Sequence, residues 1–179
     1  MMTPDDMIDF WYGAGEDAWF EKNAAFDGAL AVRFGGALKE ARLGAFDHWG
    51  ETPRGALGLV LLLDQVSRNI HRGSPLAFAA DAKALALARQ WIGKGYHQKL
   101  PVPYARWFLM PYEHAEDLDA QHRCVALFNT MGLHVIAYWA KVHLDIIAKF
   151  GRFPHRNAVL GRTSTPAELA FLKAGGFSG

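Results

Sequence analysis

The chain has 179 residues, of which 51% are hydrophobic and 21% are charged, so it has the composition of a globular protein rather than a disordered or fibrous one. Lys and Arg number 19 against 18 Asp and Glu, and the formal net charge of +1 argues against a general binder of nucleic acids or anionic membranes. The one cysteine, Cys124, excludes intramolecular disulfides and metal sites with several cysteine ligands, and it fits a reducing compartment.

The sequence contains no segment that indicates export or membrane insertion. Its first residues, Met-Met-Thr-Pro-Asp-Asp, lack the basic and apolar regions of a secretory signal. The longest apolar run, Leu57–Leu63, is far shorter than the ~18 residues that a membrane span needs. We therefore expect a cytoplasmic protein without a membrane or nucleic-acid partner, and its oligomeric state stays open.

Four hydroxyl–proline pairs mark the expected helix starts, because the hydroxyl accepts a hydrogen bond from a free backbone N–H and proline has no N–H to leave unpaired. These pairs are Thr3-Pro4, Thr52-Pro53, Ser74-Pro75 and Thr165-Pro166. Thr165 and Glu168 also have the spacing of a capping box. Glycines are expected to end helices at Gly13, Gly44, Gly73, Gly93, Gly95, Gly132 and Gly151.

Between these marks the apolar residues recur at helical spacing. The first stripe consists of Phe26, Leu30, Phe34, Leu38 and Ala41. Leu57–Leu63 is apolar on all sides, which predicts a central helix surrounded by others. A helix opened by Ser74-Pro75 is expected to carry Phe78, Leu85, Ala88 and Ile92. The last stripe consists of Ile136, Trp139, His143, Ile146 and Phe150.

No segment shows the sustained alternation of apolar and polar residues that predicts a strand, and no linker-like composition divides the chain. The pattern therefore predicts an all-α protein in which residues 1–179 form a single domain of about seven or eight helices.

The first polar cluster interrupts the central apolar segment. Asp64 and Arg68 are four residues apart and so share a helix face, and Arg72 extends the same row. This pair is either a structural salt bridge or part of a pocket wall, and an unpaired Arg72 would favour an anion site. The candidate ligand-binding residues here are Asp64, Arg68, Asn69 and Arg72.

The second cluster is Met110–Asp117, where Glu113 and His114 are candidates for general acid–base catalysis. Acidic side chains in a first helical turn are also favoured by the helix dipole, with no catalytic role. The chain contains neither Glu-x-x-His nor His-Glu-x-x-His, so no metal site is expected.

The third cluster combines His143 with the polar loop that follows Phe150. His143 interrupts an apolar stripe, so it is either a satisfied core histidine or a catalytic one, and His155 is a further catalytic candidate. Arg152, Arg156 and Asn157 are candidate ligand-binding residues. If this loop packs near Arg68 and Arg72, four guanidiniums converge, and such clusters hold carboxylates or phosphates. The Glu113–Asp117 segment could equally supply the internal counter-ions.

The sequence lacks the glycine-rich signatures of ATPases and dinucleotide-binding proteins and the Gly-x-Ser-x-Gly elbow of hydrolases, so no cofactor is expected. Cys124 lies in a predicted helix and has the environment of a core residue.

Several strings resemble a family of bacterial proteins known as domain of unknown function 924, over about residues 6–172. They are Phe10–Gly13, Trp19-Phe20, Leu63–Gln65 with Arg68-Asn69, Pro111 with Glu113–Asp117, Phe150–Asn157, Leu160–Arg162 and Thr165-Pro166 with Glu168. Val66-Ser67 stands where Phe-Pro is usual, which favours a helix that continues smoothly through this point. The resemblance implies a tetratricopeptide-like fold of stacked helical hairpins and no established activity, although no 34-residue repeat is legible.

Three interpretations of the polar clusters follow. The first is a helical binding protein that holds a small anionic ligand or an acidic peptide in a pocket lined by arginine and histidine. The second is an enzyme, a hydrolase or transferase acting on an anionic ester, in which histidines move protons and arginines stabilise negative charge. The third is a purely structural network in which the polar residues pair only with one another.

Overall fold

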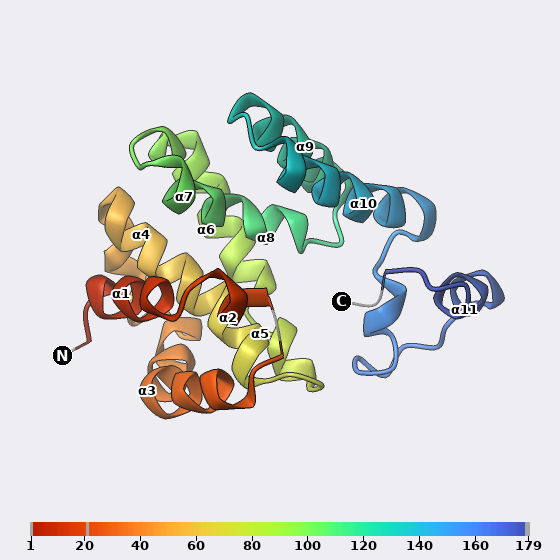
Figure 1. The fold of residues 1–179 in the computed structure, drawn as a ribbon, viewed down its shortest axis with the longest axis horizontal. Helices are drawn as coiled ribbons and strands as arrows, with labels where there is room; N and C mark the ends of the chain where they lie inside the picture. Colours follow the sequence, from red (N-terminus) through yellow and green to blue (C-terminus); the bar gives the residue numbers. More distant parts are fainter. Residues whose placement is uncertain (1, 21, 178–179) are drawn as a thin grey trace. The chain divides into compact units, whose positions relative to one another are not determined.

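The structure is a computed structural model that describes residues 2–20 and 22–177. Within these residues the chain is all-helical and contains no strand, which confirms the predicted fold class (Figure 1). When uninterrupted helical stretches are counted once, the described part holds nine helices, slightly more than expected. The stacked-hairpin arrangement implied by the family resemblance stays a prediction.

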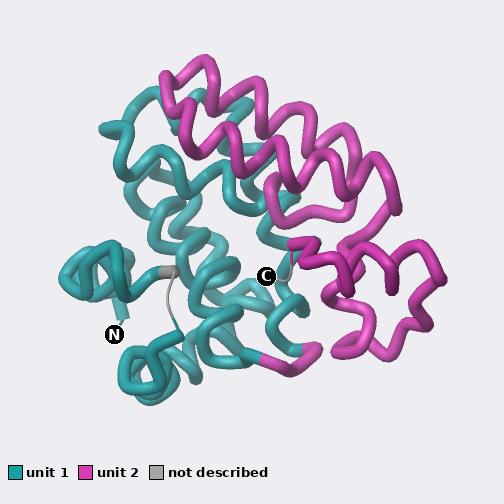
Figure 2. Tube along the Cα trace, turned by 45° about the vertical axis from the view of Figure 1, so that its right-hand side comes forward, with its two compact units in different colours: residues 1–72, 76–111 teal, residues 73–75, 112–179 magenta. Residues whose placement is uncertain are grey.

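The chain divides into two compact units, coloured separately in Figure 2. Unit 1 comprises residues 1–72 and 76–111, and unit 2 comprises residues 73–75 and 112–179. The expected single domain over residues 1–179 stays a prediction.

Unit 1 is organised around one long helix. Its separate helices are α1 (Pro4–Ala14), α2 (Glu16–Phe20), α3 (Ala24–Arg42) and α6 (Asp81–Gly93). The long helix consists of α4 (Pro53–Val60), which continues into η2 (Leu61–Val66) and α5 (Ser67–Ile70). A further continuous stretch consists of α7 (Val102–Ala105), η5 (Arg106–Leu109) and α8 (Met110–Glu113), and the last two residues of α8 belong to unit 2. Short 3₁₀ turns lie at η1 (Asp47–Glu51), η3 (Pro75–Phe78) and η4 (Tyr96–Gln98). The helix does continue through Val66-Ser67, and η2 just before this point is π-helical.

The central helix is buried on all sides, as its sequence predicts. Every residue from Leu57 to Leu63 is buried, and the α3 stripe from Phe26 to Ala41 is buried as well. Gly58 allows α1 to approach closely, because a Cβ at this position would lie 2.9 Å from Pro4 Cα.

Three of the four predicted helix starts are confirmed, and the fourth is wrong in its extent. Thr3, Thr52 and Thr165 cap α1, α4 and α11 (Pro166–Lys173) through their side-chain oxygens. Ser74-Pro75 precedes only the 3₁₀ turn η3, because the Ala79 N–H donates to Leu76 O three residues back. The α-helical pattern starts when the Ala84 N–H donates to Ala80 O, so α6 begins at Asp81.

Gly13 is not a helix end, because it lies inside α1. Gly15 ends that helix instead, with φ of +82° and its N–H donating to Tyr12 O. The left-handed conformation needed at this point favours glycine, and the sequence offers two glycines within three residues.

Unit 2 is built on α9 (Leu118–Thr130) and α10 (His134–Phe150), which pack along each other, followed by η6 (Pro154–Arg156) and α11. The predicted stripe on α10 is wrong in part, because Trp139 is 51% exposed. The buried face instead consists of Ala137, Ala140, His143, Leu144, Ile146 and Ile147. The small alanines allow α9 to approach, and the bulky Trp139 is left on the outer face.

None of the described helices combines the length and the apolar character that a bilayer span requires.

Candidate functional site

The predicted site residues fall into both units. Asp64, Arg68, Asn69 and Arg72 belong to unit 1, whereas Glu113, His114, His143, Arg152, His155, Arg156 and Asn157 belong to unit 2. Their predicted convergence on one pocket stays a prediction.

In unit 1, Arg68 joins two carboxylates. Its Nη1 donates to Asp64 Oδ1 at 3.1 Å and its Nη2 donates to Asp81 Oδ2 at 2.9 Å, while Gln65 Nε2 donates to Asp64 Oδ2. Asp64 is buried within the π-helical turn η2. Burial would lower the pKa of Arg68, but the charges of Asp64 and Asp81 raise it above its usual value. Arg68 is therefore held as a cation between two acids.

Asn69 and Arg72 both bind Asp27 of α3. Asn69 Nδ2 donates to Asp27 Oδ1 at 2.8 Å, and Arg72 Nε donates to Asp27 Oδ2 at 2.7 Å. Arg72 thus has a carboxylate partner that is 45 residues away in the sequence. Both arginines of this cluster are paired within unit 1.

In unit 2, Glu113 and His143 form a buried carboxylate–imidazole pair. His143 Nδ1 lies 2.9 Å from Trp139 O and 3.3 Å from Glu113 Oε1. A carbonyl oxygen can only accept, so this geometry places the proton on Nδ1 and leaves Nε2 as the basic nitrogen. Burial lowers the pKa of His143; the bond to Trp139 opposes this shift and the charge of Arg156 adds to it. The imidazole is accordingly neutral near pH 7.

Cys124 is completely buried on α9, as predicted for a core residue. Burial and the nearby charge of Glu113 raise the pKa of its thiol. Cys124 therefore stays a thiol and does not supply a nucleophile.

His155 and Arg156 lie on η6, the 3₁₀ turn after α10. Arg156 Nη1 donates to His114 O at 3.0 Å, and its guanidinium lies 4.3 Å from the centre of the Phe153 ring. Burial, followed by the charge of Arg156, lowers the pKa of His155 to about 4. In the part of the chain that the structure describes, no group binds its buried Nδ1.

The other basic residues of this loop are paired with glutamates. Arg152 donates from Nε and Nη2 to the two oxygens of Glu168, at 2.6 and 2.9 Å. The bonds from Arg152 and from the Thr165 N–H lower the pKa of Glu168 to about 2.

Arg162 binds Glu116 in the same bidentate way, at 2.6 and 2.9 Å, and its Nε donates to Asn157 Oδ1. The Glu113–Asp117 segment thus supplies a counter-ion to the loop, which was one of the predicted alternatives.

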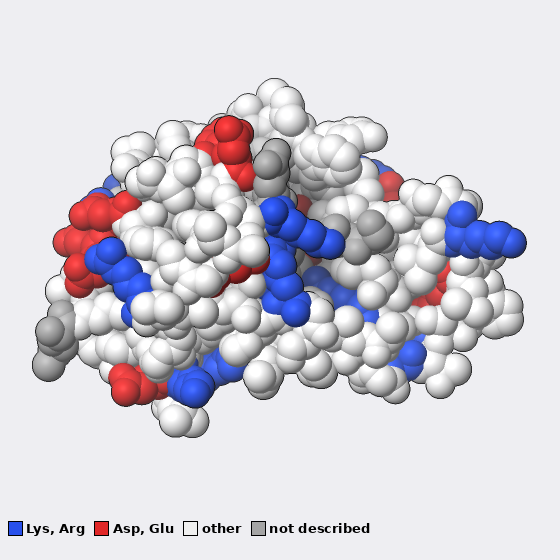
Figure 3. All heavy atoms as spheres, turned by 60° about the horizontal axis from the view of Figure 1, so that its bottom comes forward, with Lys and Arg blue, Asp and Glu red and all other residues white. Residues whose placement is uncertain are grey.

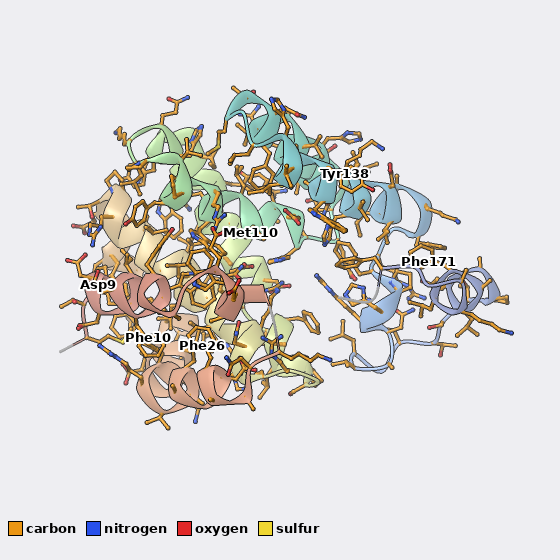
Figure 4. The ribbon with its side chains drawn as sticks, viewed as in Figure 1. Asp9, Phe10, Phe26, Met110, Tyr138 and Phe171 are labelled. Atoms are coloured by element: carbon orange, nitrogen blue, oxygen red, sulfur yellow. The ribbon has the colours of Figure 1, made fainter. Side chains whose placement is uncertain are left out.

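Two adjoining cavities lie along α10 and α11 in unit 2. The first, of about 230 Å³, is lined by Val142, Asp145, Ile146, Lys149, Phe150, Phe171 and Phe177. The second, of about 480 Å³, is lined by Lys149, Phe150, Arg152, Thr165, Ala167 and Glu168. Because Lys149 and Phe150 border both, we call the two together the α10–α11 groove. Figure 4 labels Phe171 on its α11 side.

Lys149 is the cation of this groove that has no carboxylate partner among the described residues. Its Nζ lies 5.0 Å from the centre of the Phe150 ring and 5.9 Å from that of Phe171. Asp145, the acid of the first cavity, pairs with Lys141 one turn earlier on the exposed side of α10. Arg152 is occupied by Glu168.

Sequence reasoning missed this groove. Of the predicted site residues, only Arg152 lines it. The sequence signal that could have revealed the groove is Lys149 next to Phe150 in the last turn of α10, together with the later aromatic residues Phe171 and Phe177. On the face drawn in Figure 3, acidic and basic side chains both occur among neutral ones, as the net charge of +1 suggests.

These features define, over the described residues, an all-helical protein with networks of ion pairs and an apolar groove in unit 2. The sequence profile of a family described as "Bacterial protein of unknown function (DUF924)" matches residues 7–176, and the chain belongs to this family. A solved structure titled "Structure of Protein of Unknown Function ATU0120 from Agrobacterium tumefaciens" is similar, with 40% identity, a TM-score of 0.91 and coverage of 96% of this chain and 97% of that one. No curated protein matches the chain. The family and the related structure carry no established activity.

Proposed function

We propose that this protein is a cytoplasmic binding protein and that the α10–α11 groove of unit 2 holds a small organic anion with an apolar body. The supporting observation is Lys149, a cation that has no carboxylate partner among the described residues and lies at the shared edge of two cavities. The walls made by Ile146, Phe150 and Phe171 suit the apolar body. A carboxylate head beside Lys149 then completes the ion pair that the described residues leave open.

This proposal changes the roles of the predicted residues. Arg152 supports the wall of the groove through Glu168 rather than binding the anion itself, because a bidentate partner already occupies its guanidinium. His143 and His155 contribute through Phe177, whose ring contacts both imidazoles and also lines the first cavity.

For Asp64, Arg68, Asn69 and Arg72 of unit 1 we propose the structural role. Every charge of this set lies within hydrogen-bonding distance of an opposite charge, which is what a structural network needs. An anion would compete with Asp64 and Asp81 for Arg68 and with Asp27 for Arg72.

A titration with hexanoate, measured by calorimetry and by thermal shift, tests the groove. A ligand at 100 times its dissociation constant adds about 2.7 kcal/mol to stability, which gives a clear shift. Lys149→Gln should raise the dissociation constant about fivefold, the value of one partly exposed ion pair of about 1 kcal/mol. Lys173→Gln is the matched control, since Lys173 is exposed on α11 and lines neither cavity. If both variants bind hexanoate like the parent, the groove is not the anion site.

The Glu113–His143 pair supports a second candidate function, a hydrolase or transferase acting on an anionic ester. Glu113 holds the imidazole in the tautomer that leaves Nε2 basic, the arrangement that a general base requires. Hydrolysis of a panel of small esters tests it. The activity should disappear in His143→Gln while circular dichroism stays unchanged, and an activity that survives this substitution would exclude His143 as the base.

A further inference from the structure

The aromatic ring of Phe177 lies between the first cavity and two histidines of unit 2, the buried His143 and the partly buried His155. Its centre lies 4.5 Å from that of the His143 imidazole and 5.3 Å from that of His155, both edge-to-face. Phe177 also packs against the buried cluster of Ile146, Ile147 and Phe153, and it lines the first cavity. Phe177 therefore contacts both imidazoles and also borders the first cavity.

The end of α11 delivers this ring to its place. Gly175 adopts a left-handed φ of +79°, and the Gly176 N–H donates to Phe171 O. A Cβ at Gly176 would lie 2.5 Å from the Phe171 ring, so the chain passes directly over that ring before it reaches Phe177. The backbone turn thus specifies where Phe177 goes, while Phe177 itself remains only partly buried.

We propose that the place of Phe177 is an aromatic subsite, and that the ligand of the groove is a small carboxylate bearing an aromatic ring that replaces Phe177 against His143 and His155. This inference rests on the proposed function of the groove and names its ligand class. Phe177 then acts as a tethered competitor, which is released when the ligand ring enters.

The surroundings of the ring favour an aromatic occupant over an aliphatic one. The Phe177 ring contacts the rings of His143 and His155 edge-to-face, at spacings that aromatic pairs prefer, and it packs against the cluster that contains Phe153. Such pairs add binding beyond the area that they bury. Lowered pKa values keep both imidazoles neutral near pH 7, so the ring does not have to desolvate a cation.

The position of the cation fits the other end of such a ligand. Lys149 lines the same cavity as Phe177, so one molecule in this cavity can reach both. A carboxylate joined to a phenyl group by a short chain matches the two features together.

The test compares 3-phenylpropionate with hexanoate on the full chain by calorimetry. In the parent protein Phe177 occupies the subsite, so the two ligands should bind with similar affinity. The Phe177→Ala variant should bind 3-phenylpropionate about tenfold more tightly than the parent, because no tethered ring competes for the subsite. Its dissociation constant for hexanoate should change less than twofold. Leu169→Ala, an exposed change on α11 that lines neither cavity, should alter neither affinity.

Phe177→Leu serves as a second variant, since it keeps an apolar side chain at this point and protects the fold if the alanine variant does not fold. It should also bind 3-phenylpropionate more tightly than hexanoate, with a ratio of dissociation constants of about three. If the ratio of the two affinities stays at its parental value in the folded variants, the aromatic subsite is excluded.

The two proposals fail in different ways. If hexanoate binds the parent and Lys149→Gln weakens it, but the Phe177 variants gain no aromatic preference, the groove stands and the subsite falls. If neither ligand binds the parent or any variant, the groove itself is wrong, and the subsite is overturned with it.

Discussion

The two units treat their basic side chains differently. In unit 1, Arg68 has two carboxylate partners and Arg72 has one, so the polar cluster on the central helix is closed. In unit 2, Arg152 and Arg162 are paired with glutamates in the same way, but Lys149 lies at the groove beside two aromatic rings and has no carboxylate partner among the described residues. The comparison separates charges that hold the fold from one that is available to a ligand.

This difference bears on how arginine-rich sequences are interpreted. A cluster of arginines suggests an anion site only while their partners are unknown, and here most partners lie far away in the sequence. A buried arginine requires a carboxylate partner, because an unpaired buried charge is costly in free energy. The exposed lysine that adjoins apolar walls is therefore the better indicator of a vacant site.

Among the charged side chains, the largest effect should come from removing Arg68 from its two ion pairs in unit 1. Arg68→Ala leaves the buried carboxylate of Asp64 facing Asp81 without a cation between them, and it should lower the free energy of unfolding by about 3 kcal/mol. Urea denaturation followed by circular dichroism measures this change.

Arg72→Ala is the matched control, because Arg72 is more exposed and Asp27 keeps its bond to Asn69. It should cost no more than about 1 kcal/mol. Equal costs in the two variants would mean that Arg68 does not act as a buried counter-ion.

The parts of the fold that depend on neighbouring residues were predictable. Thr3, Thr52 and Thr165 cap helices because a hydroxyl and a following proline satisfy the first turn locally. The all-round apolar segment Leu57–Leu63 became the central helix because no side of it can face water. The Asp64–Arg68 pair followed from helical spacing alone.

The parts that depend on tertiary packing were not predictable. The partner of Arg72 is 45 residues away, so no local spacing reveals it. Which side of α10 meets α9 depends on how closely the backbones approach, and this choice left Trp139 outside. Phe177 reaches the histidines only because Gly175 and Gly176 turn the chain back after α11.

A smaller effect should appear in the pH dependence of unit 2. His155 has a pKa of about 4 in the folded protein against about 6.5 in an unfolded chain. Between these values the unfolded chain binds a proton that the folded protein does not, so the free energy of unfolding falls as the pH drops from 6.5 towards 4. When the pH falls from 7 to 5, the free energy of unfolding of His155→Gln should drop by about 1 kcal/mol less than that of the parent. This difference is smaller than the full pKa shift would give, because the ring is partly exposed and solvent screens it.

Equilibrium denaturation at the two pH values measures this difference, with the exposed His122→Gln as control. A variant at His155 that follows the parental pH dependence would show that folding does not lower the pKa of this imidazole.

The smallest effect should come from Trp139→Ala on the outer face of α10. The side chain is 51% exposed, and its role in the His143 pair is limited to a backbone oxygen that alanine retains. The free energy of unfolding should therefore change by no more than about 0.5 kcal/mol, against about 3–5 kcal/mol for the buried Trp11→Ala. Thermal denaturation and sedimentation velocity, measured together, check both values. A loss of more than 1 kcal/mol at Trp139 together with a change in sedimentation would mean that a second molecule covers this face, and the apolar surface of unit 2 would then serve association as well as ligand binding.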